Sequence, residues 1–157
     1  ATSFEDVARA WTWDVASVAL GGVAVEEVMD LSITIDNALI NKHTLNASKE
    51  PSRTKRDGFR TVAIEGTMLF ETMSHYQDWK SQTEQNFKLH LVDTGSEVSS
   101  GYSDSITIEC PTFKYDEFKP NASGTGQIEV PISGRGVYNV GSGHSMKITM
   151  VNTKAAY

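Results

Sequence analysis

Apolar and polar residues alternate along six stretches of this chain. In one of them Val62, Ile64, Met68 and Phe70 share one parity, and Thr61, Glu65, Thr67 and Glu71 lie on the other. Side chains of a β-strand point alternately to its two faces, so a period of two gathers the apolar residues on one face. We therefore expect strands with one face in a core and one face solvated or covered by a partner. The stretches are 31–36, 61–71, 86–91, 105–110, 127–132 and 145–150.

One segment between two of these strands has helical spacing instead. Met73, Tyr76 and Trp79 lie three residues apart, which predicts an amphipathic helix of about three turns with its aromatic stripe against a sheet. Ser74 followed by Gln77 resembles a capping box at its start. With a two-residue hairpin at Gly21-Gly22, this predicts a mainly β fold: an antiparallel β-sandwich or barrel with one short packed α-helix, not alternating βαβ units.

Charge is distributed unevenly along the chain. The net charge of −6 disfavours a tight general nucleic-acid binder, which needs a basic footprint. Residues 42–60, however, carry six bases against two acids, giving +4. Their content of Asn, Lys, Ser, Pro and Gly predicts a long surface loop rather than a core element. Such a charge is typical of a solvated loop or of a contact surface, and composition alone favours the solvated loop.

Motifs for catalysis, metal binding and phosphate binding are missing. His43, His75, His90 and His144 lack the spacing of a zinc site, and no serine lies in a G-x-S-x-G elbow. A Ser/His/acid triad stays open, since its members meet only in space. Three glycine pairs precede strand residues rather than a helix, which predicts turns and bulges; they are Gly124/Gly126, Gly134/Gly136 and Gly141/Gly143. We expect no enzyme, no catalytic residue, no metal and no cofactor.

The single cysteine, Cys110, lies on the apolar parity of its stretch, which predicts a buried structural thiol and excludes an intrachain disulfide. No run approaches the roughly 18 apolar residues of a membrane-spanning helix, and the first residues lack the pattern of a signal peptide. The length predicts one domain, 1–157. The first residue is Ala rather than Met, which is compatible with processing or with a piece of a longer protein.

The order of these elements resembles that of the tail tube protein, the major tail protein of long-tailed bacteriophages. The similarity extends from about Val15 to Tyr157 and rests on pattern and order rather than on a strict signature. Its most telling pieces are the strand that ends in Ile35-Asp36-Asn37, the segment from Arg60 to Phe70 that leads to Tyr76 and Trp79, and the C-terminal KITMVNT.

The resemblance implies a structural virion protein. Six subunits would form a ring in which their inner strands join into one barrel, and rings would stack into a hollow tube. DNA and a tape-measure protein would pass through the tube without specific binding, with other tail proteins at its ends and no membrane binding by this chain. Assembly would take place in the host cytoplasm. A tube from a contractile tail, a gene transfer agent or a secretion apparatus fits the same pattern.

The resemblance also implies contact segments. The long loop after the first hairpin typically reaches the neighbouring ring or subunit; here it runs from Asn37 to Gly58. Its hypothetical inter-subunit contact residues are Lys49, Arg53, Lys55 and Arg56. The ends of the chain, Ala1 to Trp13 and Lys154 to Tyr157, would serve as additional arms.

Two other functions compete with this interpretation. A carbohydrate- or receptor-binding β-sandwich module would need exposed aromatic platforms, for which the candidates are Trp11, Trp13, Tyr102 and Tyr138. A small β-sandwich hydrolase is disfavoured because its motifs are missing.

Overall fold

The computed structural model describes residues 13–45, 49–99, 102–120 and 126–152. A 3₁₀ turn (Trp13–Val15) leads into the first strand. The strands that follow are β1 (Ala16–Leu20), β2 (Val23–Val25), β3 (Val28–Asp36), β4 (Leu39–Lys42), β5 (Arg53–Arg56) and β6 (Thr61–Leu69). After the helix α1 (Ser74–Ser81) come β7 (Gln85–Ser99), β8 (Tyr102–Phe118), β9 (Glu129–Gly136) and β10 (Lys147–Val151).

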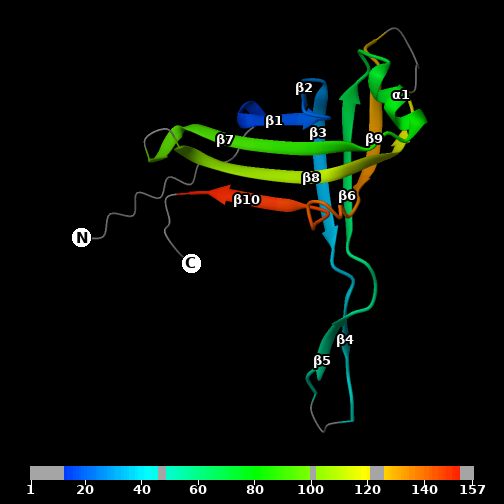
Figure 1. Cartoon of the computed structure of the whole chain (residues 1–157), viewed down its shortest axis with the longest axis vertical. Helices are drawn as coiled ribbons and strands as arrows, with labels where there is room; N and C mark the ends of the chain where they lie inside the picture. The colour runs from blue at the N-terminus through cyan, green and yellow to red at the C-terminus, as the bar shows by residue number, and fades with distance from the viewer. Residues whose placement is uncertain (1–12, 46–48, 100–101, 121–125, 153–157) are drawn as a thin grey trace.

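Eight of the strands form one folded antiparallel sheet. Its order is β2-β1-β7-β8-β9-β6-β3, and β10 pairs with β8. Figure 1 shows two layers: β1, β7, β8 and β10 cross the group of β3, β6 and β9 at a steep angle. The long β8 belongs to both layers, because residues 105–109 pair with β10 and residues 113–118 pair with β9. The prediction of a mainly β sandwich with one short helix is confirmed for the described residues.

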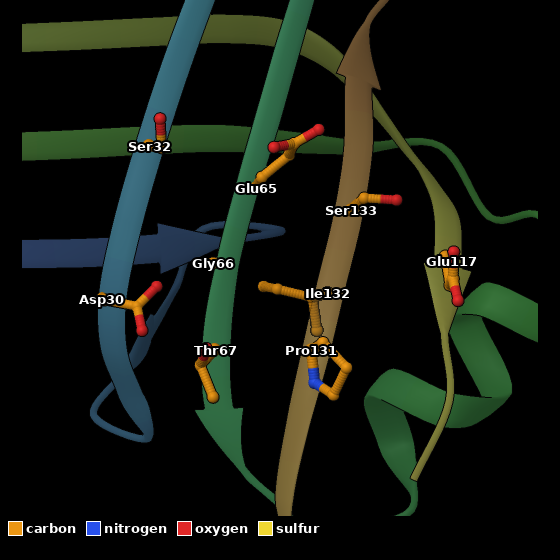
Figure 2. A pocket seen from close by; sticks show the side chains of 9 residues that line it. All are labelled: Asp30, Ser32, Glu65, Gly66, Thr67, Glu117, Pro131, Ile132 and Ser133. Carbon is orange, nitrogen blue, oxygen red and sulfur yellow. The ribbon is translucent and has the colours of Figure 1, made fainter.

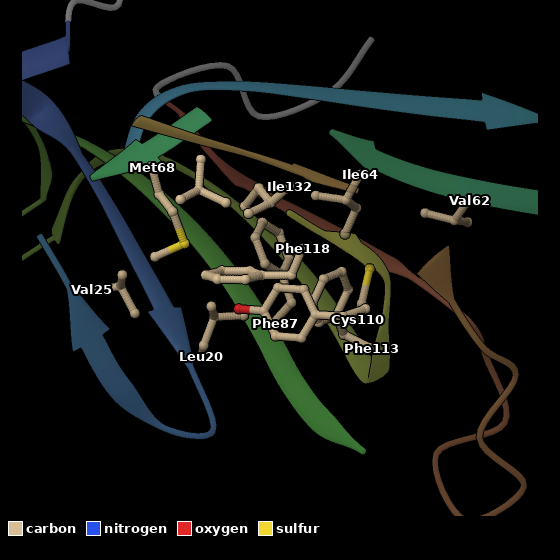
Figure 3. Packing of buried hydrophobic residues seen from close by; sticks show 12 residues of the cluster. Leu20, Val25, Val62, Ile64, Met68, Phe87, Cys110, Phe113, Phe118 and Ile132 are labelled. Atoms are coloured by element: carbon tan, nitrogen blue, oxygen red, sulfur yellow. The ribbon is translucent and has the colours of Figure 1, made fainter. Parts of the chain in front are cut away.

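The core fills the space where the two layers cross (Figure 3). Val62, Ile64 and Met68 of β6 face it, each at most 2% exposed, as the alternation predicted. Tyr115 and Phe118 close it from β8, with their rings edge to face at 5.9 Å. Burying one such large apolar side chain contributes roughly 1.5–3 kcal/mol to folding.

The helix is shorter than predicted, with eight residues in place of three turns. Its N-cap residue is Met73, which makes no side-chain cap hydrogen bond, and the hydroxyl of Ser74 pairs with Thr72 Oγ1 at 2.8 Å. The predicted capping box is therefore wrong, because Ser74 is already the first helical residue. Tyr76 and Trp79 pack against the core as expected, whereas Met73 is 54% exposed.

The basic segment 37–58 is not an irregular loop. It contains the two-stranded ribbon β4–β5, paired from Leu39↔Arg56 to Lys42↔Arg53. Every residue of both strands is exposed. The prediction of an irregular loop is wrong because strands were recognised by alternating apolar residues. A ribbon with no core beneath it has no buried face, so its sequence does not show that alternation. Figure 1 shows the ribbon projecting from the two layers as an extension of β3 and β6.

The glycines divide between turns and strand interiors. Gly21 and Gly22 adopt φ of 61° and 83° in the β1–β2 hairpin, as predicted. Gly141 and Gly143 lie in the turn before β10, also as predicted. Gly134 and Gly136, in contrast, belong to β9, so the turn prediction is wrong for them; Gly134 does lie at an irregularity, because it pairs with Tyr115 at the register shift between β8 and β9. Gly126 precedes β9, and Gly124 is outside the described residues.

The last strand departs from the expected pattern as well. Ile148 and Met150 of β10 are 52% and 56% exposed. The expectation that the apolar face of every strand lies in a core is therefore wrong here, because the second layer does not extend as far as β10.

Candidate assembly surfaces

The basic side chains of the ribbon β4–β5 lie on two opposite faces. Residues opposite each other in a ladder share a face, so Ile40, Lys42, Arg53 and Lys55 lie together. Arg56 lies on the other face, across from Leu39. The structure thus brings Arg53 and Lys55 together, separates Arg56 from them, and leaves Lys49 outside the two strands. Sequence reasoning missed Lys42, which only the register of the ribbon could have revealed.

The base of the ribbon is held by hydrogen bonds. The Ala38 amide donates to Asp36 Oδ1 at 2.7 Å, and the Asp57 amide donates to the Ala38 carbonyl at 2.8 Å. Arg60 Nε donates to Asn37 Oδ1 at 2.7 Å. The second and third bonds tie the two sides of the ribbon together where they leave β3 and enter β6, so the cations extend from a fixed point.

An open groove of about 430 Å³ lies on the outer face of β3, β6 and β9 (Figure 2). Three carboxylates and no basic side chain line it. Gly66 forms part of its floor, where an added Cβ would collide with the Asp30 carbonyl. The lining residues are Asp30, Ser32, Glu65, Gly66, Thr67, Glu117, Pro131, Ile132 and Ser133. Most of them have the parity opposite to the core residues of the same strands.

Few cations offset this negative charge. Lys119 pairs with Glu117 at 2.7 Å, and Arg135 pairs with Asp116 at 3.3 Å at the edge of the same face. Asp30 and Glu65 make no ion pair with any described residue. Screening restricts the effect of such charges to about 8–10 Å at ordinary salt, so this face repels an anion that comes close to it.

Three of the four histidines form hydrogen bonds to other residues, and the single cysteine is buried. His90 Nδ1 bonds Thr107 Oγ1 at 2.8 Å, and His75 Nδ1 lies 3.4 Å from the Tyr115 hydroxyl. Cys110 is fully buried, which confirms the predicted structural thiol, and burial raises its pKa to about 11. Within the described ranges no group of three His, Cys, Asp or Glu residues could hold a metal ion. No helix among these residues is long and apolar enough to cross a membrane.

The aromatic platforms of a carbohydrate-binding module are represented by one side chain, Tyr138, which is 61% exposed. Trp11 is outside the described residues, and the side chains of Trp13 and Tyr102 are not described.

Residues 1–136 match a family model described as phage tail tube protein. The chain belongs to this family. A tail tube protein has a structural role in a tube and is a virion component, which favours the tube function over the carbohydrate- or receptor-binding alternative. No curated protein matches the chain.

Solved structures with the same fold come from several large assemblies. The chain is similar to a protein from the virion of a native gene transfer agent, with a TM-score of 0.58, 10% identity, and coverage of 91% of this chain and 100% of that chain. It is also similar to a chain of the anti-feeding prophage cap, with a TM-score of 0.56, 13% identity, and coverage of 96% of this chain and 99% of that chain. A third similar chain is in the sheath-tube complex of an extracellular contractile injection system. Its TM-score is 0.55 and its identity 13%, with coverage of 96% of this chain and 99% of that chain. At these identities the likeness concerns the fold.

Proposed function

We propose that this tail tube protein assembles into six-membered rings that stack into the hollow tube of a phage tail, the conduit for DNA ejection, and that it has no catalytic activity. The ribbon β4–β5 is the observation that carries the proposal. It projects from the body, is exposed along both strands, and is held at its base. A segment of this kind is suited to a contact with another copy.

Charge supports a contact between copies of this one chain. Residues 42–60 carry +4, and the rest of the chain carries −10. Complementary charge of this kind steers association and fixes its register. Because the ribbon and its acidic receptor are different surfaces, the contact is heterologous, the type that generates rings or open stacks. Lys49, Arg53, Lys55 and Arg56, joined by Lys42, would make it.

The groove face of β3, β6 and β9 is suited to the wall of the lumen. It is polar, and it carries the carboxylates of Asp30 and Glu65 on adjacent strands. DNA inside a conduit must pass without being held, and a wall with a net negative charge repels its phosphates. β3 is an edge strand with a free ladder on one side, so the sheet can continue into a neighbour and close a barrel.

The remaining parts of the proposal follow from the tube. The tape-measure protein and DNA would occupy the lumen without specific binding, and other tail proteins would cap the tube ends. Subunits would assemble in the host cytoplasm before joining the virion. Residues 1–157 would act as one domain, with 1–13 and 154–157 as arms; apart from Trp13, these arms are outside the described residues.

Charge reversal in the ribbon tests the proposal. We expect Arg53→Glu/Lys55→Glu/Arg56→Glu to block stacking, so that negative-stain microscopy shows rings without tubes. The charge-conserving variant Arg53→Lys/Lys55→Arg/Arg56→Lys is the matched control and should form tubes. Reversing Arg53 and Lys55 without Arg56, and the converse, shows which face of the ribbon makes the contact. Tubes of normal length from the triple reversal would contradict the proposal.

A further inference from the structure

Apolar side chains form aligned rows across four strands of the first layer. Register places Ala16, Leu91, Ile106 and Met150 in one row and Val18, Leu89, Ile108 and Ile148 in the next. Leu20, Phe87 and Cys110 begin the third row. Paired residues share a face, so these rows make one continuous apolar surface on the core side of the layer.

The second layer covers only one end of this surface. Leu20, Phe87 and Cys110 are each at most 7% exposed and belong to the core. At the other end, Leu91, Ile106, Ile108, Ile148 and Met150 are not among the residues packed against the core. We name these five residues the wing face. Figure 1 shows why: β7, β8 and β10 extend well beyond β3 and β6.

The edge strand of the second layer also carries an exposed apolar side chain at its end. Leu31 and Ile33 of β3 pack against the core, whereas Ile35, of the same parity, is 42% exposed at the end of the strand. Val62, the ladder partner of Ile35 on β6, is only 1% exposed, so the uncovered apolar part of the second layer is the Ile35 end of the edge strand β3.

We propose that the wing face packs against the second layer of an adjacent copy in the same ring, which completes the sandwich between subunits. The inference rests on the proposed ring assembly and identifies the lateral contact, whereas the ribbon concerns stacking. A second copy fits because the proposed ring contains several copies of this chain, and Ile35 gives each copy an exposed apolar side chain on the edge strand of its second layer. β10 and β3, at the two ends of the contact, are both edge strands, and their two surfaces differ, so the contact repeats head to tail and closes a ring.

A cysteine accessibility experiment tests the inference. The native Cys110 is fully buried, so the only reactive thiol of Met150→Cys is the introduced one. Thiol reactivity follows exposure, so alkylation should be about tenfold slower in assembled tubes than in dilute monomer. Thr149→Cys, on the opposite face of β10, is the matched control and should change much less. Slow alkylation of Met150→Cys already in the monomer would overturn the inference, because the chain would then cover the face itself.

A second variant separates this inference from the proposed function. Ile148→Ser/Met150→Ser removes two half-exposed apolar side chains and should weaken the ring on the order of 100-fold while the monomer keeps its melting temperature. Sedimentation velocity would then show monomers where the wild type forms rings. Rings of normal stability from this variant would overturn the wing contact and leave the tube proposal standing. A wild-type protein that never assembles would instead contradict the tube proposal.

Discussion

The ring of Phe113 on β8 lies where a side chain at Gly134 on β9 would have to be. A Cβ built at Gly134 collides with the Cε2 and Cζ atoms of Phe113 and lies 2.6 Å from the Lys114 carbonyl oxygen. Phe113 is 2% exposed and is in edge contact with Tyr115 at 4.9 Å. Glycine at this position therefore lets the buried ring of Phe113 lie directly over the neighbouring strand β9, since a larger residue would displace the ring.

We expect Gly134→Ala to lower the free energy of unfolding by about 2–4 kcal/mol, because both a buried ring and the backbone of β8 must shift. Urea denaturation followed by tryptophan fluorescence measures this. Gly126→Ala is the control: a Cβ there meets nothing within 4 Å, so its effect should stay within about 0.5 kcal/mol. Equal stabilities of the two variants would contradict the packing argument.

The buried thiol of Cys110 should make the free energy of unfolding depend on pH in the alkaline range. Burial raises its pKa from 9.0 to about 11 in the native protein, so the native state keeps the thiol proton that the unfolded chain releases above pH 9. Stability from this group is complete below pH 9 and falls by about 1.4 kcal/mol per pH unit up to pH 11. Burial also raises the pKa of Tyr115, chiefly by desolvation and secondarily through Asp78, which adds a decline at higher pH.

Cys110→Ala isolates the contribution of the thiol. Urea unfolding at pH 8, 9 and 10 should show a gap between wild type and variant that narrows as the pH rises. The packing loss of the variant is the same at every pH, and Tyr115 contributes equally to both proteins. Curves that stay parallel across this range would mean that the thiol titrates alike in both states.

The proposed lumen wall predicts an effect on DNA. Tubes of Asp30→Lys/Glu65→Lys should retain short duplex DNA at about 50 mM salt. Binding to phosphates weakens steeply as salt rises, so these tubes should retain much less DNA at about 200 mM. Wild-type tubes should release it under both conditions. Nuclease-protected DNA in tubes grown with the duplex is the measurement. Asp14→Lys/Glu71→Lys makes the same charge change on exposed residues outside the groove; equal retention by that variant would place the DNA elsewhere.

Much of the fold could be predicted because local pattern and final burial agree. Val62, Ile64 and Met68 alternate in the sequence and face one core in the structure. The helix was also predictable from Tyr76 and Trp79. Its length was not, since Gln82 adopts a left-handed conformation (φ 53°) and ends it, and its side-chain amide donates to the Trp79 carbonyl at 2.8 Å. Nothing local in the sequence indicates that stop.

The candidate surfaces needed three-dimensional information. Lys42 joins Arg53 and Lys55 only through the register of the ribbon, and polar composition concealed the ribbon itself. Glu117 reaches the face of Asp30 and Glu65 after a register shift between β8 and β9 at Tyr115/Glu117, which breaks the parity of β8. The alternation of β10 correctly marked an apolar face, but it could not distinguish a core from a surface such as the wing face.

The ribbon leaves the body in one direction, as an extension of β3 and β6. A stack joined through it would therefore have all its subunits pointing the same way, so that one end displays free ribbons and the other end displays unfilled receptors. Such a tube is polar, with a defined direction along its axis. Its two ends differ chemically, and each would require its own type of terminating protein.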